Sequence, residues 1–251
     1  MSLSYLAIME ACLQERVVLT DDKDLYDLRY FYVDENHVGH CACGVAFEAM
    51  TRILRTRSVP FCAQEWYLAV KTSRNPVVQG FLAEQICLSS IANNGLLAVD
   101  ENLHSMGTAT FDSAPQWGPF LHSEHTLRLF VPTAYNFKAV DGVILRLNRS
   151  NNTAHMFPIQ ITLSPRHRDS AIVFYSTMWW DWVRPLKEAG FVVESTFVWI
   201  DVNQPANEIK EEVIKELRNN TIVVRPRYRA QHIGIEKVDR KLASSLGIVM
   251  V

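Results

Sequence analysis

The sequence predicts a layered α/β protein, and three observations carry this prediction. From residue 76 onward, segments with helical spacing of apolar residues alternate with short runs rich in β-branched and aromatic residues. Clusters of Gly, Pro, Ser and Asn separate these segments. Hydrophobic residues make up 48% of the chain and charged residues 21%, so a sizeable core can form.

The first 75 residues are predicted to form a small, mostly helical region. The polar stretch "SRNP" at 73–76 ends in a proline, which disfavours helix at the residue before it, so we place a boundary there. Residues 1–75 then precede a larger domain over 76–251. The elements expected in the first region are a helix over 2–16, a strand over 28–33 and a helix over 44–58.

The sequence of the larger domain predicts helices and strands in the order α-β-β-β-α-β-α-β. Gly95 stands where a helix C-cap glycine belongs, and Pro185 is expected to end or kink its helix. Ile209, Val213 and Leu217 are one helical turn apart. The expected segments are a helix over 76–95, a loop over 98–120, strands over 125–132, 140–147 and 154–164, a helix over 169–190, an interior strand over 191–201, a helix over 207–220 and an extended run over 221–238.

The bulk composition predicts an intracellular protein. The net charge is −2, so nucleic-acid binding would have to depend on a local basic patch. The odd number of cysteines, five, does not suit a secreted disulfide framework. The sequence shows no signal-peptide pattern and no apolar stretch of membrane-spanning length, so the cytosol or the nucleus is expected, with no membrane contact.

Residues 139–164 predict a β-hairpin with polar side chains at its open end. If the turn centres between Ser150 and Asn151, paired residue numbers sum to 301, and Asp141 faces Gln160. Alternation along a strand puts Thr162 on the same face as Gln160. The same register pairs Val143 with Pro158 and Leu145 with Met156.

This convergence is typical of a metal-dependent phosphodiesterase. Such an enzyme holds Mg²⁺ with an aspartate and a second oxygen ligand beside the scissile phosphate. Asp141 and Gln160 are the candidate metal ligands, and Glu84, on the preceding helix, is a candidate third group. Structural interpretations remain open for all three: a turn residue for Asp141, a core hydrogen bond for Gln160 and a solvated helix face for Glu84.

Four short motifs give the chain a family resemblance. "GFLAEQ" (80–85), "VDGV" (140–143), "PIQIT" (158–162) and "SPRH" (164–167) resemble the restriction-endonuclease-like, or PD-(D/E)xK, fold. More narrowly, the chain resembles the nuclease-like domain of Crinkler and retrotransposon-hot-spot proteins over about residues 28–240. The stretch at 24–39 resembles the end of the NTPase region upstream of that domain, but no GxxxxGK[ST] motif is present.

The resemblance implies a mixed sheet flanked by helices and Mg²⁺-dependent DNA cleavage. The family pattern Asp…(Asp/Glu)-x-Lys reads here as Asp141…Gln160-Ile161-Thr162. Glutamine still offers a carbonyl oxygen to the metal, but Thr162 cannot supply the charge of a lysine. Arg166 or His167 would have to supply that charge.

Two outcomes are therefore open for the domain. It is either an active nuclease or a catalytically inactive module that binds nucleic acid or a protein partner; the sequence leaves the oligomeric state open. Arg225, Arg227 and Arg229 lie two apart, so in a strand they would form a stripe that could bind phosphates. The alternative for this stripe is a charged edge strand that resists edge-to-edge pairing.

Two further clusters favour structural interpretations. "HVGHCACG" (37–44) brings together His37, His40, Cys41 and Cys43, but the spacing fits no familiar zinc motif, and buried cysteines at a helix start are expected instead. The aromatic run at 178–183 predicts packing between a helix and the sheet.

Overall fold

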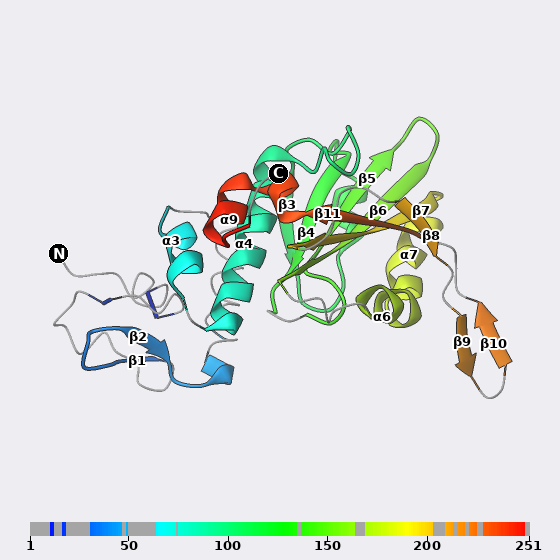
Figure 1. Cartoon of the computed structure of the whole chain (residues 1–251). Helices are drawn as coiled ribbons and strands as arrows, with labels where there is room; N and C mark the ends of the chain where they lie inside the picture. Colours follow the sequence, from blue (N-terminus) through cyan, green and yellow to red (C-terminus); the bar gives the residue numbers. More distant parts are fainter. Residues whose placement is uncertain are drawn as a thin grey trace.

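The computed structural model shows a β-sheet between two layers of helices (Figure 1). Helix α4 runs along one face of the sheet, α6 and α7 lie on the other, and α3 and α9 lie beyond α4. The ribbon formed by β9 (Lys215–Arg218) and β10 (Thr221–Val224) projects from the sheet. The structure describes residues 11–12, 17–18, 31–46, 49, 64–73, 75–134, 137–163, 169–202, 209–212, 215–218, 221–224 and 228–248.

The main sheet of the described chain is mixed, as the sequence predicts. Its seven strands lie in the order β3–β4–β5–β6–β7–β11–β8. The middle strands β4, β5 and β6 are antiparallel, whereas β6, β7 and β11 run parallel to one another. The bounds are β3 (Gly107–Phe111), β4 (Leu127–Pro132), β5 (Gly142–Asn148), β6 (Thr153–Thr162), β7 (Val192–Asp201), β11 (Tyr228–Gly234) and β8 (Ile209–Glu212).

Helix α4 (Pro76–Asn94) is confirmed together with both of its end signals. The Asn75 side chain accepts a hydrogen bond from the Val77 N–H, and Pro76 occupies the first turn, where its missing N–H costs nothing. Gly95 has φ 82° and donates its N–H to the Ile91 carbonyl, which ends the helix. Every residue from Phe81 to Ala92 is buried, so α4 is enclosed on all sides.

The two faces of the sheet support separate cores. Alternation along β6 sends Phe157, Ile159 and Ile161 toward α4, and Ala154 and Met156 toward the opposite layer. That layer contains α5 (Trp117–Leu121), α6 (Ser170–Thr177) and α7 (Trp179–Glu188).

The predicted aromatic packing at 178–183 is confirmed in this opposite layer. Trp179 and Trp182 are buried, and both pack edge-on against Phe174 of α6. Trp180, between them, is half exposed.

Three further helices lie against or near α4 on the side away from the sheet. They are α3 (Gln64–Thr72), α8 (Ile235–Val238) and α9 (Arg240–Ser245). Trp66, Ala69 and Val70 of α3 belong to the same buried cluster as α4. The boundary at residue 76 remains a prediction; α3, which precedes it, packs on the larger domain.

The N-terminal region contains a small hairpin of β1 (Phe31–Val33) and β2 (Gly39–Cys41). The predicted strand over 28–33 agrees with β1, and its first three residues lie outside the described residues. Most of the predicted helices over 2–16 and 44–58 also lies outside the described residues.

The predicted helix over 207–220 is wrong. Its described residues form β8, which pairs antiparallel with β11, and β9, which pairs with β10. The spacing of apolar residues there also suited a helix, but the backbone groups find partners on neighbouring strands, and such tertiary pairing overrides local propensity.

Smaller corrections concern boundaries. The predicted helix over 169–190 is interrupted at Met178. Helix α7 continues through Pro185, where a kink or an end was expected. Pro185 is exposed, so water can satisfy the carbonyl that the proline leaves unbonded. The predicted loop over 98–120 contains β3 and the start of α5, and the extended run over 221–238 ends in the helix α8.

Candidate functional site

The candidate site lies where β5 begins and β6 ends. Val143 pairs with Pro158 and Leu145 with Met156, so the predicted hairpin register is confirmed. The Asp141 N–H donates to the Ile159 carbonyl at 2.8 Å, which extends the ladder to the residue before β5. Asp141 and Gln160 are therefore neighbours on adjacent strands, as expected from the sequence.

The Asp141 carboxylate is buried and hydrogen-bonded. Only 5% of Asp141 and 9% of Gln160 is exposed. Asp141 Oδ2 accepts a hydrogen bond from Gln160 Nε2 at 2.6 Å and another from the Ile161 N–H at 2.6 Å. Such charge-assisted bonds offset the cost of burying the carboxylate.

The orientation of the Gln160 amide follows from this contact. An ionised carboxylate only accepts hydrogen bonds, so glutamine must turn its nitrogen toward Asp141. The same Nε2 also donates to the Ile161 carbonyl at 3.3 Å. A donor group thus lies between two oxygen atoms, Asp141 Oδ2 and Ile161 O, and a small hard cation would suit the same pair.

The backbone around Asp141 is constrained on both sides. Ala139 has φ 78°, a left-handed conformation that alanine rarely adopts. A Cβ added at Gly142 would lie 2.9 Å from Leu88 Cδ2 and 3.3 Å from Leu129 Cδ1. Glycine at position 142 therefore lets α4 approach β5 directly beside the aspartate.

Glu84 lies at the same end of the sheet. It precedes Leu88 by one helical turn on α4, and Leu88 contacts the Gly142 position. Glu84 is 6% exposed, so the solvated-face interpretation is wrong for this residue. Glu84 therefore lies on the α4 side of the sheet, whereas Gln160, between Ile159 and Ile161 on β6, points toward the opposite face.

Another acid, Asp201, lies next to Thr162 at this end of the sheet. Thr162 is the last residue of β6 and pairs with Asp201, the last residue of β7. Arg166 and His167, the predicted sources of positive charge, lie outside the described residues.

Sequence reasoning missed Asp201 and His232. Asp201 ends an apolar strand, a weak signal for a polar site, and His232 stands in no recognisable motif. Strands β6, β7 and β11 lie in one sheet (Figure 1), and their parallel pairing aligns Gln160 with Trp199 and Trp199 with His232. His232 stacks on Trp199 with ring centroids 5.8 Å apart, and its Nδ1 lies 3.8 Å from Asp201 Oδ2.

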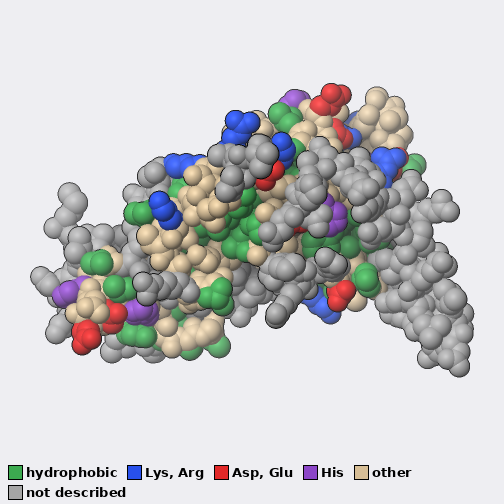
Figure 2. All heavy atoms as spheres, in the orientation of Figure 1, with side chains coloured by type: hydrophobic (Ala, Val, Ile, Leu, Met, Phe, Trp, Pro, Cys, Tyr) green, Lys and Arg blue, Asp and Glu red, His purple; other side chains and the backbone are tan. Residues whose placement is uncertain are grey.

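The basic stripe is only partly described. Arg225 and Arg227 lie outside the described residues, and Arg229 is an exposed residue of β11. The charged-edge interpretation is wrong for Arg229, because β8 covers β11 on its outer side. Figure 2 shows Lys and Arg side chains scattered over the visible face, so no broad basic patch appears among the coloured residues.

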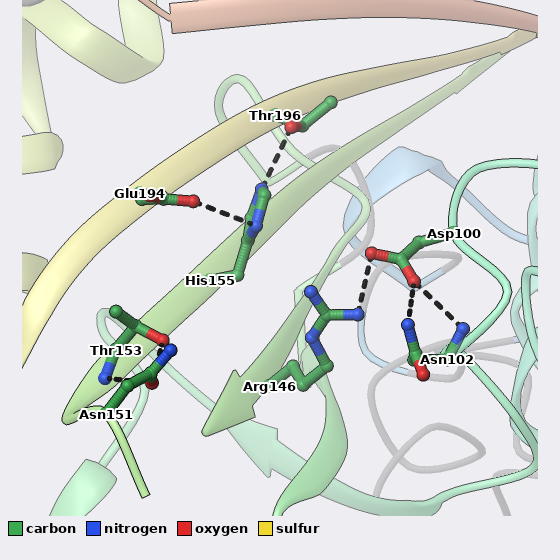
Figure 3. Close-up of polar contacts among 8 residues, drawn as sticks. All are labelled: Asp100, Asn102, Arg146, Asn151, Thr153, His155, Glu194 and Thr196. Carbon is green, nitrogen blue, oxygen red and sulfur yellow. Dashed lines mark hydrogen bonds and ion pairs between the residues drawn. The ribbon is translucent and has the colours of Figure 1, made fainter. Parts of the chain in front are cut away.

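A second polar cluster occupies the opposite end of the sheet (Figure 3). Arg146 donates to Asp100 at 2.6 Å. His155 contacts Thr196 Oγ1 through Nε2 at 2.9 Å and Glu194 Oε2 through Nδ1 at 3.6 Å. His155 on β6 thus contacts two residues of the neighbouring strand β7, and Arg146 on β5 pairs with an acid between α4 and β3.

The pKa values of this second cluster follow from its burial and charges. Burial, reinforced by the neighbouring Arg146 cation, lowers the pKa of His155 to about 4. Burial acts to raise the pKa of Asp100, but hydrogen bonds from Asn102 and Arg146 outweigh it and hold that pKa below its usual value. His155 is therefore neutral at physiological pH.

The histidines and cysteines of residues 37–44 lie in and beside the hairpin of β1 and β2. Across the described residues, no group of three or more His, Cys, Asp or Glu side chains is placed to hold a metal ion. His40 contacts Asp34 at 3.0 Å, which lowers the pKa of Asp34. Cys41 on β2 is half-buried and Cys43 is exposed, so the expectation that these cysteines are buried is wrong.

Comparison with protein-family models, with curated proteins and with solved structures gave no match to this chain. Among the described helices, none has both the length and the apolar composition needed to cross a bilayer.

Proposed function

We propose that this chain is a divergent PD-(D/E)xK-type phosphodiesterase that cleaves DNA with Mg²⁺. The observation that carries the proposal is the buried contact between Asp141 and Gln160, 2.6 Å apart, at the junction of β5 and β6. A buried acid paired with a side chain that can offer an oxygen is the minimum that such chemistry requires.

The order of elements supports the proposal. The resemblance in the sequence implies the core order α-β-β-β-α-β, and α4, β4, β5, β6, the pair α6–α7, and β7 follow that order. The strand β3 and the short helix α5 are additions between α4 and β4.

The donor set fits Mg²⁺, which prefers oxygen ligands and retains several waters. Asp141 Oδ2 and the Ile161 carbonyl already face the Gln160 nitrogen. A half-turn of the Gln160 amide would exchange its nitrogen for its oxygen, so Asp141, Gln160 and Ile161 would hold the ion, with Glu84 assisting directly or through water. When bound, Mg²⁺ polarises the phosphate and lowers the pKa of a coordinated water.

The chain's own residues have separate tasks in this proposal. The Asp141 charge anchors the site and is kept in place by the Ile161 N–H. The burial of Asp141 and Gln160 limits water at the site, which strengthens electrostatic interactions there. Thr162 offers the substrate a hydroxyl but no charge, so the positive charge must come from another residue.

The first test is calorimetric titration of Mg²⁺ and Mn²⁺ into the wild type and Asp141→Asn. The asparagine oxygen can still accept both N–H donors, so the variant removes the charge and keeps the packing. We expect metal binding and metal-dependent cleavage of DNA to be lost together. Asp100→Asn, at the opposite end of the sheet, is the matched control and should change neither.

Gln160→Glu tests the same site in the opposite direction. At a metal site the second carboxylate should tighten Mg²⁺ binding, and Mg²⁺ should raise the melting temperature of the variant. Without a metal site, two buried carboxylates would repel each other, and the variant would be destabilised by a few kcal/mol, on the order of 2–4, whether or not Mg²⁺ is present.

A second candidate function is favoured by the hydrogen bonds on Asp141. Two N–H donors on one oxygen are also what a purely structural carboxylate shows. The chain would then be an inactive module of the same fold that binds nucleic acid or a protein partner. Destabilisation of Gln160→Glu without rescue by Mg²⁺, together with no cleavage by the wild type, would establish this candidate over the first.

A further inference from the structure

His232 has an unexplained buried nitrogen. Its Nδ1 atom is fully covered and makes no hydrogen bond among the described residues. Most buried polar atoms in proteins are hydrogen-bonded, so an exception calls for a physical reason. Asp201 Oδ2 lies 3.8 Å from Nδ1, which is an ion-pair distance rather than a hydrogen bond.

The ring of His232 is held in one orientation. It lies parallel to Trp199, with an interplanar angle of 5°. The side chain is 29% exposed although Nδ1 is covered, so its exposed part consists of other atoms of the side chain.

The location of His232 ties it to the candidate site. Gln160, Trp199 and His232 are aligned across β6, β7 and β11, and Thr162 pairs with Asp201. Strands are spaced by roughly 4.8 Å, so His232 lies about 10 Å from Gln160 along the sheet. That separation suits contact with a phosphate that flanks the scissile one.

A nuclease site at the ends of β6, β7 and β11 would need a positively charged side chain. Thr162 replaces the lysine of the family pattern, and a bound DNA strand would bring several negative phosphates to the ends of these strands. Asp201 on one side of the His232 ring and a phosphate on the other would each offer an acceptor to one ring nitrogen.

We infer that His232, oriented by Asp201 and Trp199, binds a backbone phosphate of the nucleic acid held at the Asp141–Gln160 site. The inference rests on the proposed function for the substrate class. The inference goes beyond the proposed function because it names the residue that replaces the missing lysine. That residue is His232 on β11, two strands away from Thr162 in the sheet.

The test is binding of a labelled DNA duplex and of its single strand in EDTA, at about pH 6, over a range of salt concentrations. His232→Gln should weaken binding by about fivefold and reduce the salt slope by about one. His232→Lys, which restores a cation, should recover the slope. Asp201→Asn should weaken binding in the same direction, and His125→Gln, at an exposed loop histidine, should have no effect.

The outcomes separate the inference from the proposed function. Binding that is unchanged in His232→Gln, or no detectable binding by the wild type, overturns the inference. A His232-dependent salt slope supports it even when no DNA is cleaved, because the assay contains no metal. Loss of cleavage in Asp141→Asn with unchanged binding in His232→Gln would support the nuclease proposal and reject this assignment.

Discussion

A strained alanine stands two residues before the candidate metal ligand. Ala139 adopts φ 78° and is nearly buried, directly ahead of Val140 and Asp141. The left-handed region costs a residue with a Cβ about 1 kcal/mol, and such strain persists only where the surroundings fix the backbone. The conformation aims the chain so that Asp141 enters the ladder opposite Gln160.

Ala139→Gly should therefore stabilise the protein or leave it unchanged. Glycine adopts positive φ without a steric penalty, which offsets its greater freedom in the unfolded chain. Chemical denaturation should show a change in unfolding free energy between about 0 and +1 kcal/mol. Ala83→Gly in the buried middle of α4 is the control and should lose about 1 kcal/mol or more. A comparable loss in Ala139→Gly would contradict the strain argument.

The sequence predicted the pairing of the site but not its orientation. Hairpin symmetry alone placed Asp141 opposite Gln160, because a side-chain period of two and a short turn fix the register. The direction of the Gln160 amide depends on which atoms surround it, and no spacing rule contains that. Asp201 and His232 reach the site only through parallel pairing between segments distant in sequence, which local patterns cannot show.

At the scale of elements, Asp239 joins three helices. It caps α9 by accepting from the Leu242 N–H at 2.9 Å. Its other oxygen accepts from Tyr67 of α3 at 2.8 Å and from Ser90 of α4 at 2.5 Å. One side chain thus fixes the outer helices against the buried helix.

Asp239→Ala should destabilise the fold by about 2–4 kcal/mol, because it removes a helix cap and the acceptor of two partly buried hydroxyls. Tyr67→Phe, which removes one of these bonds, should cost about 1 kcal/mol. Asp181→Ala is the control: its pair with Arg184 is exposed, so thermal denaturation should be almost unchanged. Equal stabilities for the Asp239 and Asp181 variants would contradict the idea that Asp239 holds α3, α4 and α9 together.

The elements that the sequence predicted correctly are those with strong local signals. Helix α4 has a cap, a proline and a terminal glycine, and β4 to β7 are apolar runs bounded by turns. The failures at 98–120 and 207–220 are segments whose structure depends on pairing with other strands. Their local patterns were weak or fitted a helix equally well.

At the scale of the whole molecule, the sheet carries polar clusters at its two ends. The proposed site lies at one end, and His155 with Arg146 lies at the other (Figure 3). A buried neutral histidine makes the free energy of unfolding sensitive to acid, because the unfolded chain binds a proton that the folded chain does not bind.

The free energy of unfolding should fall as the pH falls from about 6.5 to 4. His155 has its pKa lowered to about 4 in the folded protein by burial and then by Arg146. An unfolded histidine titrates near 6.5, so the stability contributed above that pH is lost through this window, by up to about 3 kcal/mol. Urea denaturation at a series of pH values measures this loss. His155→Gln should flatten the dependence, whereas His125→Gln should leave it as in the wild type.

The enclosure of α4 has a consequence for the nascent chain. Tyr67 and Asp239, which meet over α4, are 172 residues apart in sequence. During synthesis, the helix and the first half of the sheet emerge long before α9 exists to cover them. Contacts of such long range slow folding, and the apolar outer side of α4 stays open to chaperones until α9 has emerged from the ribosome.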